Sequence, residues 1–302
     1  VYEYAGPGDG AYAPVQPLPA PTRQRLVDLT GSVEPVAGVE VFGEWAGSLN
    51  DQNRFSGRDA GDDRGRAYTA GVRVAPMRME VGGTTLGTVS GRVRRRERGQ
   101  NFVTFDQTRP IEYGRRWNLS RGGSGLPDRL LDRGDETVDE GQVSVDWGRD
   151  SSLEAGGGRL TVGSAFEAWR RRGALSVEEP GWPRLSLQAV SITSTDRSAE
   201  VEGAWRRQAA TVRQPLWDGR LEPRLDVRRE RRRQRARGTD SLTAESVRFL
   251  EVRPELSYAN GPVEASASLE RRTEQGVVHG SFRDALRTWT AQTELALDPQ
   301  AP

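Results

Sequence analysis

Apolar and polar residues alternate along much of this chain, in short runs separated by turn residues. In residues 39–49 the odd positions are apolar or glycine, while the even positions include Glu40, Glu44 and Ser48. Side chains of a β-strand alternate between its two faces, so this run predicts a strand with one apolar and one polar face. The turn residues at 35–38 predict an antiparallel hairpin with the run before it, residues 25–34.

The same unit of strand and turn recurs to the end of the chain. Further strands are predicted at residues 67–75, 84–96, 142–147, 158–170, 184–193, 199–212, 221–232, 247–258, 263–272 and 286–297. The turns between them include residues 76–83 and strong turn pairs such as Asp218-Gly219. About a dozen strands in this order predict an all-β fold, an antiparallel up-and-down meander that forms part or all of a transmembrane β-barrel.

The meander is expected to occupy residues 25–297. Residues 1–24 form an extended lead-in rich in Gly, Pro and Tyr, where prolines exclude the helix that a phosphate-binding glycine loop requires. Residues 99–137 form an irregular insertion with a short helix at 127–132, and residues 298–302 form a tail. The insertion contains Phe102, Phe105, Tyr113 and Trp117, too many aromatic residues for a free linker, so part of it is expected to pack.

Composition narrows the class of protein. Hydrophobic residues make up 34% of the chain and the mean hydropathy is −0.71, which indicates extensive loops or strands with a single apolar face. The net charge of +1 argues against general binding of polyanions, and the lack of Cys excludes disulfides and thiolate chemistry. No run of about 18 apolar residues is present, so a transmembrane helix is excluded, whereas short alternating strands can still cross a membrane.

A polar loop at residues 50–65 is the one candidate metal site. Its oxygen donors are Asp51, Asn53, Asp59, Asp62 and Asp63, which could coordinate Ca²⁺. Their spacing does not match the EF-hand loop, and the alternative is a solvated acidic loop. No other cofactor is predicted.

The most basic stretch is residues 226–237. It contains Arg228, Arg229, Arg231, Arg232 and Arg233, whose guanidinium groups could contact a barrel lumen or the phosphates of lipopolysaccharide. Nucleic acid is not predicted as a partner, because the net charge is near zero and no aromatic residues are interleaved here. The alternative is a polar strand face that continues into a solvated loop.

Catalysis is not predicted. His279 is the only histidine, and Ser281 follows it by two residues, but no carboxylate can be singled out to orient a nucleophile and base. A single histidine in a glycine-containing turn is usually exposed and without a catalytic role.

Six tryptophans lie in or near predicted strands, and two interpretations of them stay open. They could form belts at the two surfaces of a membrane, or they could be ordinary aromatic residues of a β core. These residues are Trp45, Trp147, Trp169, Trp205, Trp217 and Trp289.

Three patches carry a resemblance: YAGPGDGAY at residues 4–12, the pattern E-x-A-x-S-x-x-D-x-N-x-F-S that begins at Glu44, and EYGRRWNL at residues 112–119. Together they resemble large, uncharacterised outer-membrane β-barrel proteins of Gram-negative bacteria. The resemblance implies an outer-membrane location and no demonstrated catalytic residues. Both ends of the sequence favour a fragment, so further strands of the same longer polypeptide are expected beside this sheet.

The sequence therefore predicts a structural or pore-forming outer-membrane protein that is not an enzyme, in contact with outer-membrane lipid and lipopolysaccharide. The alternative is a soluble or cell-surface β-rich binding module, located in the periplasm or at the cell surface. In the barrel, one strand face would line the lumen with both signs of charge, from Arg92, Arg94, Arg159, Glu167, Glu264 and Glu294. The long connections at 50–65 and 99–137 are expected outside the cell, and the short ones at 35–38 and 76–83 in the periplasm.

Overall fold

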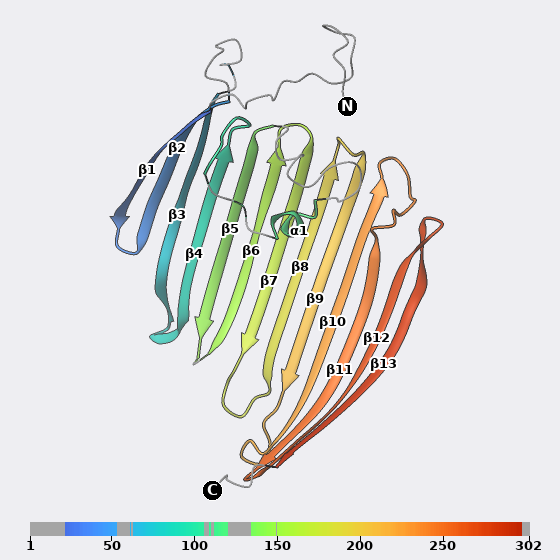
Figure 1. Ribbon diagram of the computed structural model, residues 1–302. Coiled ribbons are helices and arrows are strands. Elements are labelled where there is room, and N and C mark those ends of the chain that lie inside the picture. Colours follow the sequence, from blue (N-terminus) through green and yellow to red (C-terminus); the bar gives the residue numbers. More distant parts are fainter. Residues whose placement is uncertain are drawn as a thin grey trace, which may run out of the picture.

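In the part of the chain that the structure describes, thirteen β-strands form one antiparallel sheet, in which every strand pairs with its neighbours in the sequence (Figure 1). The computed structural model describes residues 22–52, 61, 63–105, 109, 112–119, 134–148 and 150–297. The strands are β1 Arg23–Val36, β2 Val39–Asp51, β3 Arg64–Val81, β4 Thr84–Arg98, β5 Glu136–Trp147, β6 Ser151–Val162, β7 Phe166–Val177, β8 Arg184–Asp196, β9 Val201–Arg213, β10 Leu221–Ala236, β11 Val247–Asn260, β12 Val263–Val278 and β13 Ser281–Leu297. The predicted all-β antiparallel up-and-down meander is confirmed.

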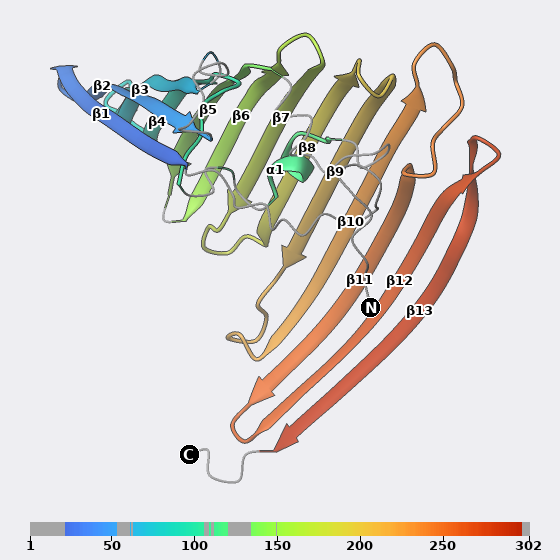
Figure 2. The same ribbon diagram turned by 45° about the horizontal axis from the view of Figure 1, so that its top comes forward.

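The only helix in the described residues is α1, Tyr113–Arg116, which lies in the connection between β4 and β5. No helix of the described part of the chain has the length and apolar character needed to cross a membrane. The sheet is twisted and curved, and β1 and β13 lie at its two separate edges (Figures 1 and 2). Among the described strands, β1 pairs only with β2, and β13 only with β12.

Residues 158–170, predicted as one strand, are instead a hairpin. β6 ends at Val162 and β7 begins at Phe166, and these two residues pair directly across the turn. Gly163, with φ of 46°, lies in the turn, and the backbone N–H of Ala165 donates to the carbonyl of Val162 at 3.0 Å. The three-residue turn leaves the odd and even positions in phase, so apolar residues on both sides of it share one face. The alternation therefore passed through the turn without a visible break.

The predicted turn at residues 76–83 is wrong in its first half. β3 continues to Val81, and the chain reverses only at Gly82 and Gly83, which have φ values of 60° and 80°. Pro76 lies where the pairing with β4 shifts between Val74 and Met77, and proline has no N–H to give to a regular ladder at that point. The predicted helix at 127–132, residues 1–21 of the lead-in and the tail at 298–302 lie outside the described residues.

The strand registers divide the side chains into two faces of opposite character. We call one the apolar face; its large apolar residues, each at least 37% exposed, include Val33, Val41, Trp45, Val72, Val93, Val143, Leu153, Trp169, Leu187, Val212, Leu225, Leu250, Leu256, Leu269, Trp289 and Leu295. We call the other the polar face; its charged residues include Arg73, Arg92, Arg94, Arg96, Glu136, Glu140, Arg170, Arg172, Arg207, Glu230, Arg232, Glu251, Glu264, Arg272 and Glu294. A water-soluble sheet protein normally has the reverse arrangement, with its apolar face covered.

A cluster of buried apolar residues lies on the polar face. Tyr113, Trp117 and Leu119, from the connection between β4 and β5, pack there on side chains of β5, β6 and β7. The sheet residues of this cluster are Val138, Leu160, Val162, Phe166 and Ala168. The prediction that part of the insertion packs is confirmed, although the side chain of Phe105 is 64% exposed.

Candidate functional site: the covered polar face

The connection between β4 and β5 folds back over the polar face, and α1 lies in front of the sheet (Figures 1 and 2). We call residues 99–105, 109 and 112–119 of this connection the cover. Trp117 is 1% exposed, and its indole ring lies against Gly158 of β6, where an added Cβ atom would approach the ring to 3.2 Å. A glycine in a strand often permits such a close approach, and here it lets the cover sit directly on the sheet.

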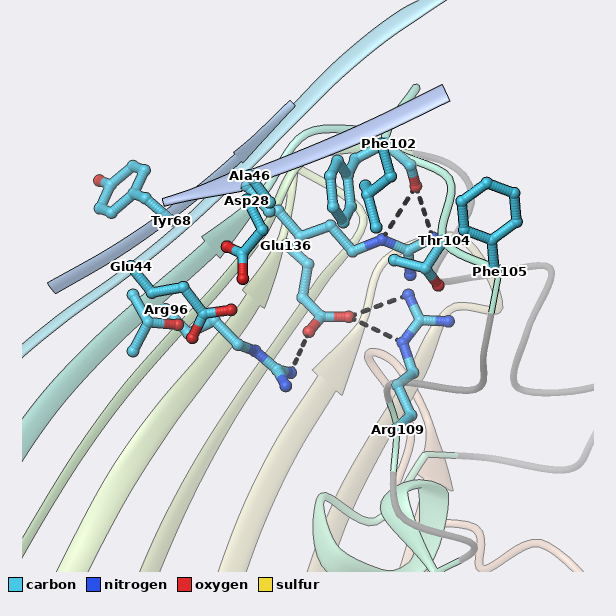
Figure 3. Close-up of a pocket in the computed structure, with 14 residues that line it drawn as sticks. Asp28, Glu44, Ala46, Tyr68, Arg96, Phe102, Thr104, Phe105, Arg109 and Glu136 are labelled. Carbon is cyan, nitrogen blue, oxygen red and sulfur yellow. Dashed lines mark hydrogen bonds and ion pairs between the residues drawn. The ribbon is translucent and has the colours of Figure 1, made fainter. Parts of the chain in front are cut away.

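Glu136 joins the cover to the first residues of β5. Its carboxylate is 2% exposed and accepts hydrogen bonds from Arg96 of β4 at 2.5 Å, from Nε of Arg109 at 3.1 Å and from the Tyr113 hydroxyl at 3.0 Å. Figure 3 shows Arg96 and Arg109 approaching this carboxylate from opposite sides. Burial raises the pKa of the Tyr113 hydroxyl above its ordinary value, and the negative charge of Glu136 raises that pKa further. Tyr113 therefore acts as a neutral donor to a buried carboxylate.

Glu140 makes a second attachment four residues along β5. Its carboxylate pairs with Arg94 of β4 at 2.5 Å and with Arg116 of α1. Glu136 and Glu140 lie on the same face of β5, so one strand supplies both carboxylates that bind the arginines of the cover.

Asn118 makes the third attachment, to strands β8 and β10 on the same face of the sheet. Its side-chain amide donates to the hydroxyl of Ser194 on β8 at 3.0 Å, and its oxygen accepts from Nε of Arg232 on β10 at 3.0 Å. The residue has a φ of 53°, a left-handed conformation that Asn tolerates better than most residues, and this ends the turn after α1. Trp205 of β9, which is 4% exposed, has the guanidinium group of Arg115 from α1 5.6 Å from the centre of its ring.

A cavity of about 400 Å³ lies between the cover and strands β1 to β5. It combines aromatic rings with charges of both signs, as Figure 3 shows, and its lining includes Asp28, Glu44, Arg96, Arg98, Phe102, Phe105, Arg109 and Glu136. Arg98 fixes one wall by donating to the carbonyl of Phe102 at 2.9 Å. The cavity can accept a solute that carries both apolar and polar groups.

A second depression, of about 130 Å³, lies beside α1 on the same face. We call it the arginine depression; its lining is Arg92, Arg94, Arg116, Arg170, Arg172, Glu140, Gln142, Gly141 and Gly157. Sequence reasoning did not single out Glu136, Glu140, Arg116 or Asn118, because their roles depend on how the insertion folds back. One available signal was the run Gly156-Gly157-Gly158, since three glycines inside a strand indicate a close approach of other groups.

The predicted Ca²⁺ ligands are only partly described. Asp51 ends β2 and Asp63 lies just before β3, with the Asn50 N–H donating to the Asp63 carbonyl at 2.7 Å. Asn53, Asp59 and Asp62 lie outside the described residues. Within the described ranges, no group of three or more His, Cys, Asp or Glu side chains is placed to hold a metal ion. The Ca²⁺ site stays a prediction.

The five predicted arginines of β10 are divided between the two faces. Arg228 and Arg232 lie on the polar face, where they pair with Glu251 at 3.5 Å and Glu245 at 3.4 Å. The remaining three, Arg229, Arg231 and Arg233, lie on the apolar face. Consecutive residues of a strand point to opposite sides, so these five cannot form one patch.

The six charges predicted to share the lumen face are also divided. Arg92, Arg94, Glu264 and Glu294 lie on the polar face. The placement of Arg159 and Glu167 there is wrong, because both lie on the apolar face beside Trp169. Leu160 and its apolar neighbours lie on the polar face because they pack against the cover there. In this part of the sheet the apolar positions therefore mark the polar face, opposite to the assumption of the prediction.

The tryptophans separate into two groups. Trp45, Trp169 and Trp289 lie on the apolar face and are 43%, 50% and 63% exposed, whereas Trp205 is buried on the polar face. Trp147 ends β5, and Trp217 lies 69% exposed in the connection between β9 and β10 at the same end of the sheet. His279 lies in the β12–β13 turn with φ of 50°, and is exposed.

Comparisons with models of protein families, with curated proteins and with solved structures found no match to this chain. The two faces of the sheet and the cover are therefore the observations from which a function can be argued.

Proposed function

We propose that this chain forms part of the wall of an outer-membrane β-barrel, with its apolar face toward lipid and its polar face toward an aqueous lumen. In this proposal the protein is structural or pore-forming and has no catalytic activity. The cover occupies the lumen and narrows it, as loops and plugs do in other barrels.

The observation that carries the proposal is the exposure of the apolar face. Soluble monomers rarely expose contiguous apolar patches larger than a few hundred Å², whereas here exposed Val, Leu and Trp side chains recur on strands from β1 to β13. On β11 the apolar positions extend from Leu250 to Tyr258, nine residues that match the ~9–11 needed for a tilted strand to cross a bilayer.

Aromatic residues at one end of the sheet support a membrane interface there. Trp147 ends β5, Trp182 and Trp217 lie in the connections after β7 and β9, and all three reach the same end of the strands. Trp182 and Trp217 are each 69% exposed. Indole rings concentrate where apolar and aqueous layers meet, so this end fits the edge of a bilayer.

The charges of the polar face support a water-filled lumen. They pair mainly with one another, as in Arg73–Glu40 at 2.5 Å and Arg272–Glu274 at 3.0 Å. Charges of both signs on the second face of each strand are typical of barrels that enclose water.

The two edge strands of the sheet favour pairing with additional strands. The outermost strands β1 and β13 each have one paired side in the described structure, and a lipid-facing sheet cannot leave backbone groups unpaired at an edge. Further strands of the same longer polypeptide would complete the wall. On the apolar face Arg233 lies nearest the end that bears the long connections, where lipopolysaccharide phosphates would be its partners, whereas Arg231 lies level with Arg206 and Arg229 lies farther from that end.

The alternative is a soluble or cell-surface β-rich binding module, and one observation favours it. Arg171 and Arg206 lie within the central strands β7 and β9 on the apolar face, where a charge is costly in lipid. In that case a second layer, rather than lipid, would pack on the apolar face.

Flotation with lipid vesicles distinguishes the two. After refolding in the presence of vesicles, a barrel wall should float with the lipid and stay there through a high-salt and carbonate wash. Recovery of the folded sheet in the aqueous fraction would contradict the membrane proposal. Conductance of the full-length protein across a planar bilayer then separates an open pore from a plugged or purely structural barrel.

A further inference from the structure

The arginine depression has more positive charge than its surroundings neutralise. Five guanidinium groups line it, and among the described residues Glu140 is the only carboxylate in its lining. Glu154 reaches Arg172 at 3.9 Å from outside it. Counting both carboxylates, three positive charges remain in excess, whereas the arginines of the polar face elsewhere mostly pair with carboxylates one to one.

Two cross-strand rows of the polar face create this cluster. In one row Arg92 lies opposite Gln142, then Gly156, then Arg172; in the next, Arg94 lies opposite Glu140, then Gly158, then Arg170. Arginines of β4 and β7 therefore converge on β5 and β6, and α1 adds Arg116 from above.

The glycines of β6 provide the space. A Cβ atom on Gly156 would lie 3.2 Å from Nε of Arg172, in the region that this guanidinium group now crosses. Because β6 has no side chain there, Arg172 reaches across it and donates to the Gln142 side chain at 2.5 Å. The backbone of β5 and β6 therefore forms the base of the arginine depression, and guanidinium groups form its sides.

Several hydrogen-bond donors of the arginine depression have no acceptor. The Nε atoms of Arg92, Arg116 and Arg170 are buried and have no hydrogen-bond partner among the described residues. Neither Arg92 nor Arg170 forms an ion pair with a described carboxylate, although Arg92 stacks on Phe42, 5.0 Å from the centre of the ring. Buried donors without acceptors are costly, and a bound anion with several oxygens would balance the positive charge of these guanidinium groups.

We propose that the arginine depression binds a phosphate, as the free ion or as the phosphoryl group of a phosphorylated solute. Guanidinium groups bind phosphate oxygens through paired, charge-assisted hydrogen bonds, and a doubly charged anion matches an excess of three positive charges better than a carboxylate does. The site goes beyond a pore-forming or structural role. It depends on the polar face and the cover, and not on lipid.

Binding of inorganic phosphate to the full chain in detergent micelles at low ionic strength, measured by isothermal titration calorimetry, tests the site. We expect saturable binding with about one phosphate per chain, weakened about tenfold or more in Arg170→Gln, because a hydrogen bond to a charged group is lost. The matched control is Arg171→Gln, one residue along β7 on the apolar face, which should bind like the unchanged chain. Arg92→Gln on β4 provides a second variant of the site if Arg170→Gln does not fold.

Further arms identify the source of the phosphoryl group. Glucose 6-phosphate that binds more tightly than inorganic phosphate, with no binding of glucose or acetate, would assign the site to phosphorylated solutes; the reverse order would assign it to the free ion. Absence of saturable phosphate binding by the unchanged chain, or equal weakening in Arg171→Gln, would overturn the site. Failure to float with vesicles would leave this result unaffected, so the two proposals can fail separately.

Discussion

The indole ring of Trp117 lies on Gly158, and a Cβ atom at position 158 would lie 3.2 Å from that ring, closer than an ordinary contact. A Cβ atom there would also come within 2.6 Å of the Asp139 carbonyl oxygen. The position of the cover on the polar face is thus coupled to a single residue of the sheet.

Gly158→Ala should displace the cover. The added methyl group clashes with the Trp117 ring and with β5, and overpacking of this kind destabilises by about 1–3 kcal/mol. Urea unfolding in micelles measures the loss, and in a background where Trp117 is the single tryptophan, an emission shifted to longer wavelength would report its exposure. Gly141→Ala is the matched control, because its Cβ atom would have no neighbour closer than 3.8 Å. Equal behaviour of the two variants would contradict the close contact.

Glu136→Gln should release the cover from the first residues of β5. The change leaves Arg96 and Arg109 without their shared negative charge in a buried site, and breaking a buried pair in this way costs about 3–5 kcal/mol. Limited proteolysis should then cut within the cover while the sheet stays intact. Glu40→Gln, which breaks the exposed pair with Arg73 on the polar face, should cost less than about 1 kcal/mol and leave the cover resistant.

Tyr113 should lower the free energy of unfolding as the pH becomes alkaline. Tyrosine in the unfolded chain loses its proton near pH ~10, whereas burial and Glu136 raise the pKa of the Tyr113 hydroxyl in the folded chain. Above that pH the folded state holds one more proton than the unfolded state, so the free energy of unfolding should fall as pH rises. Unfolding curves from pH 8 to 11 measure this slope, which should be shallower in Tyr113→Phe. An unchanged slope would mean that Tyr113 ionises as a free tyrosine does.

The order of strands was predictable because period-two alternation survives in nearly every strand, and turn pairs mark many of the boundaries. The hairpin at Gly163 was not, since a three-residue turn keeps odd and even positions in phase. Nor could alternation tell which face is covered. That depends on Trp117 and Tyr113, which lie in an irregular insertion whose contacts are with residues far away in sequence.

The same limit explains the incomplete prediction of the site. The arginines of β10 are consecutive in the sequence, and the prediction treated them as one group. In a strand, consecutive side chains point to opposite faces, so Arg228 and Arg229 lie on different sides of the sheet. In the arginine depression, Arg92 comes from β4 and Arg170 from β7, and the whole insertion lies between these strands in the sequence. No local sequence pattern therefore predicts the depression.

The ends of the sheet should face different compartments. In bacterial barrels the long connections are extracellular and the short turns periplasmic. Residues 237–246 connect β10 to β11 at the end that also bears the connections after β2 and β4, and residues 37–38 turn at the opposite end. The chain contains no Cys, so Asp240→Cys should react with an impermeant maleimide on intact cells, and Ala37→Cys only after lysis. The reverse result would invert the orientation.

Quenching of tryptophan fluorescence by lipids brominated in their acyl chains tests the lipid contact of the apolar face most directly. The chain is refolded into such vesicles as single-tryptophan variants that keep either Trp169, 50% exposed on the apolar face, or Trp205, 4% exposed on the polar face. A wall in lipid predicts strong quenching of Trp169 and little quenching of Trp205, with unbrominated lipid as the reference. Absence of quenching at Trp169, or equal quenching of both, would contradict a lipid-facing apolar surface.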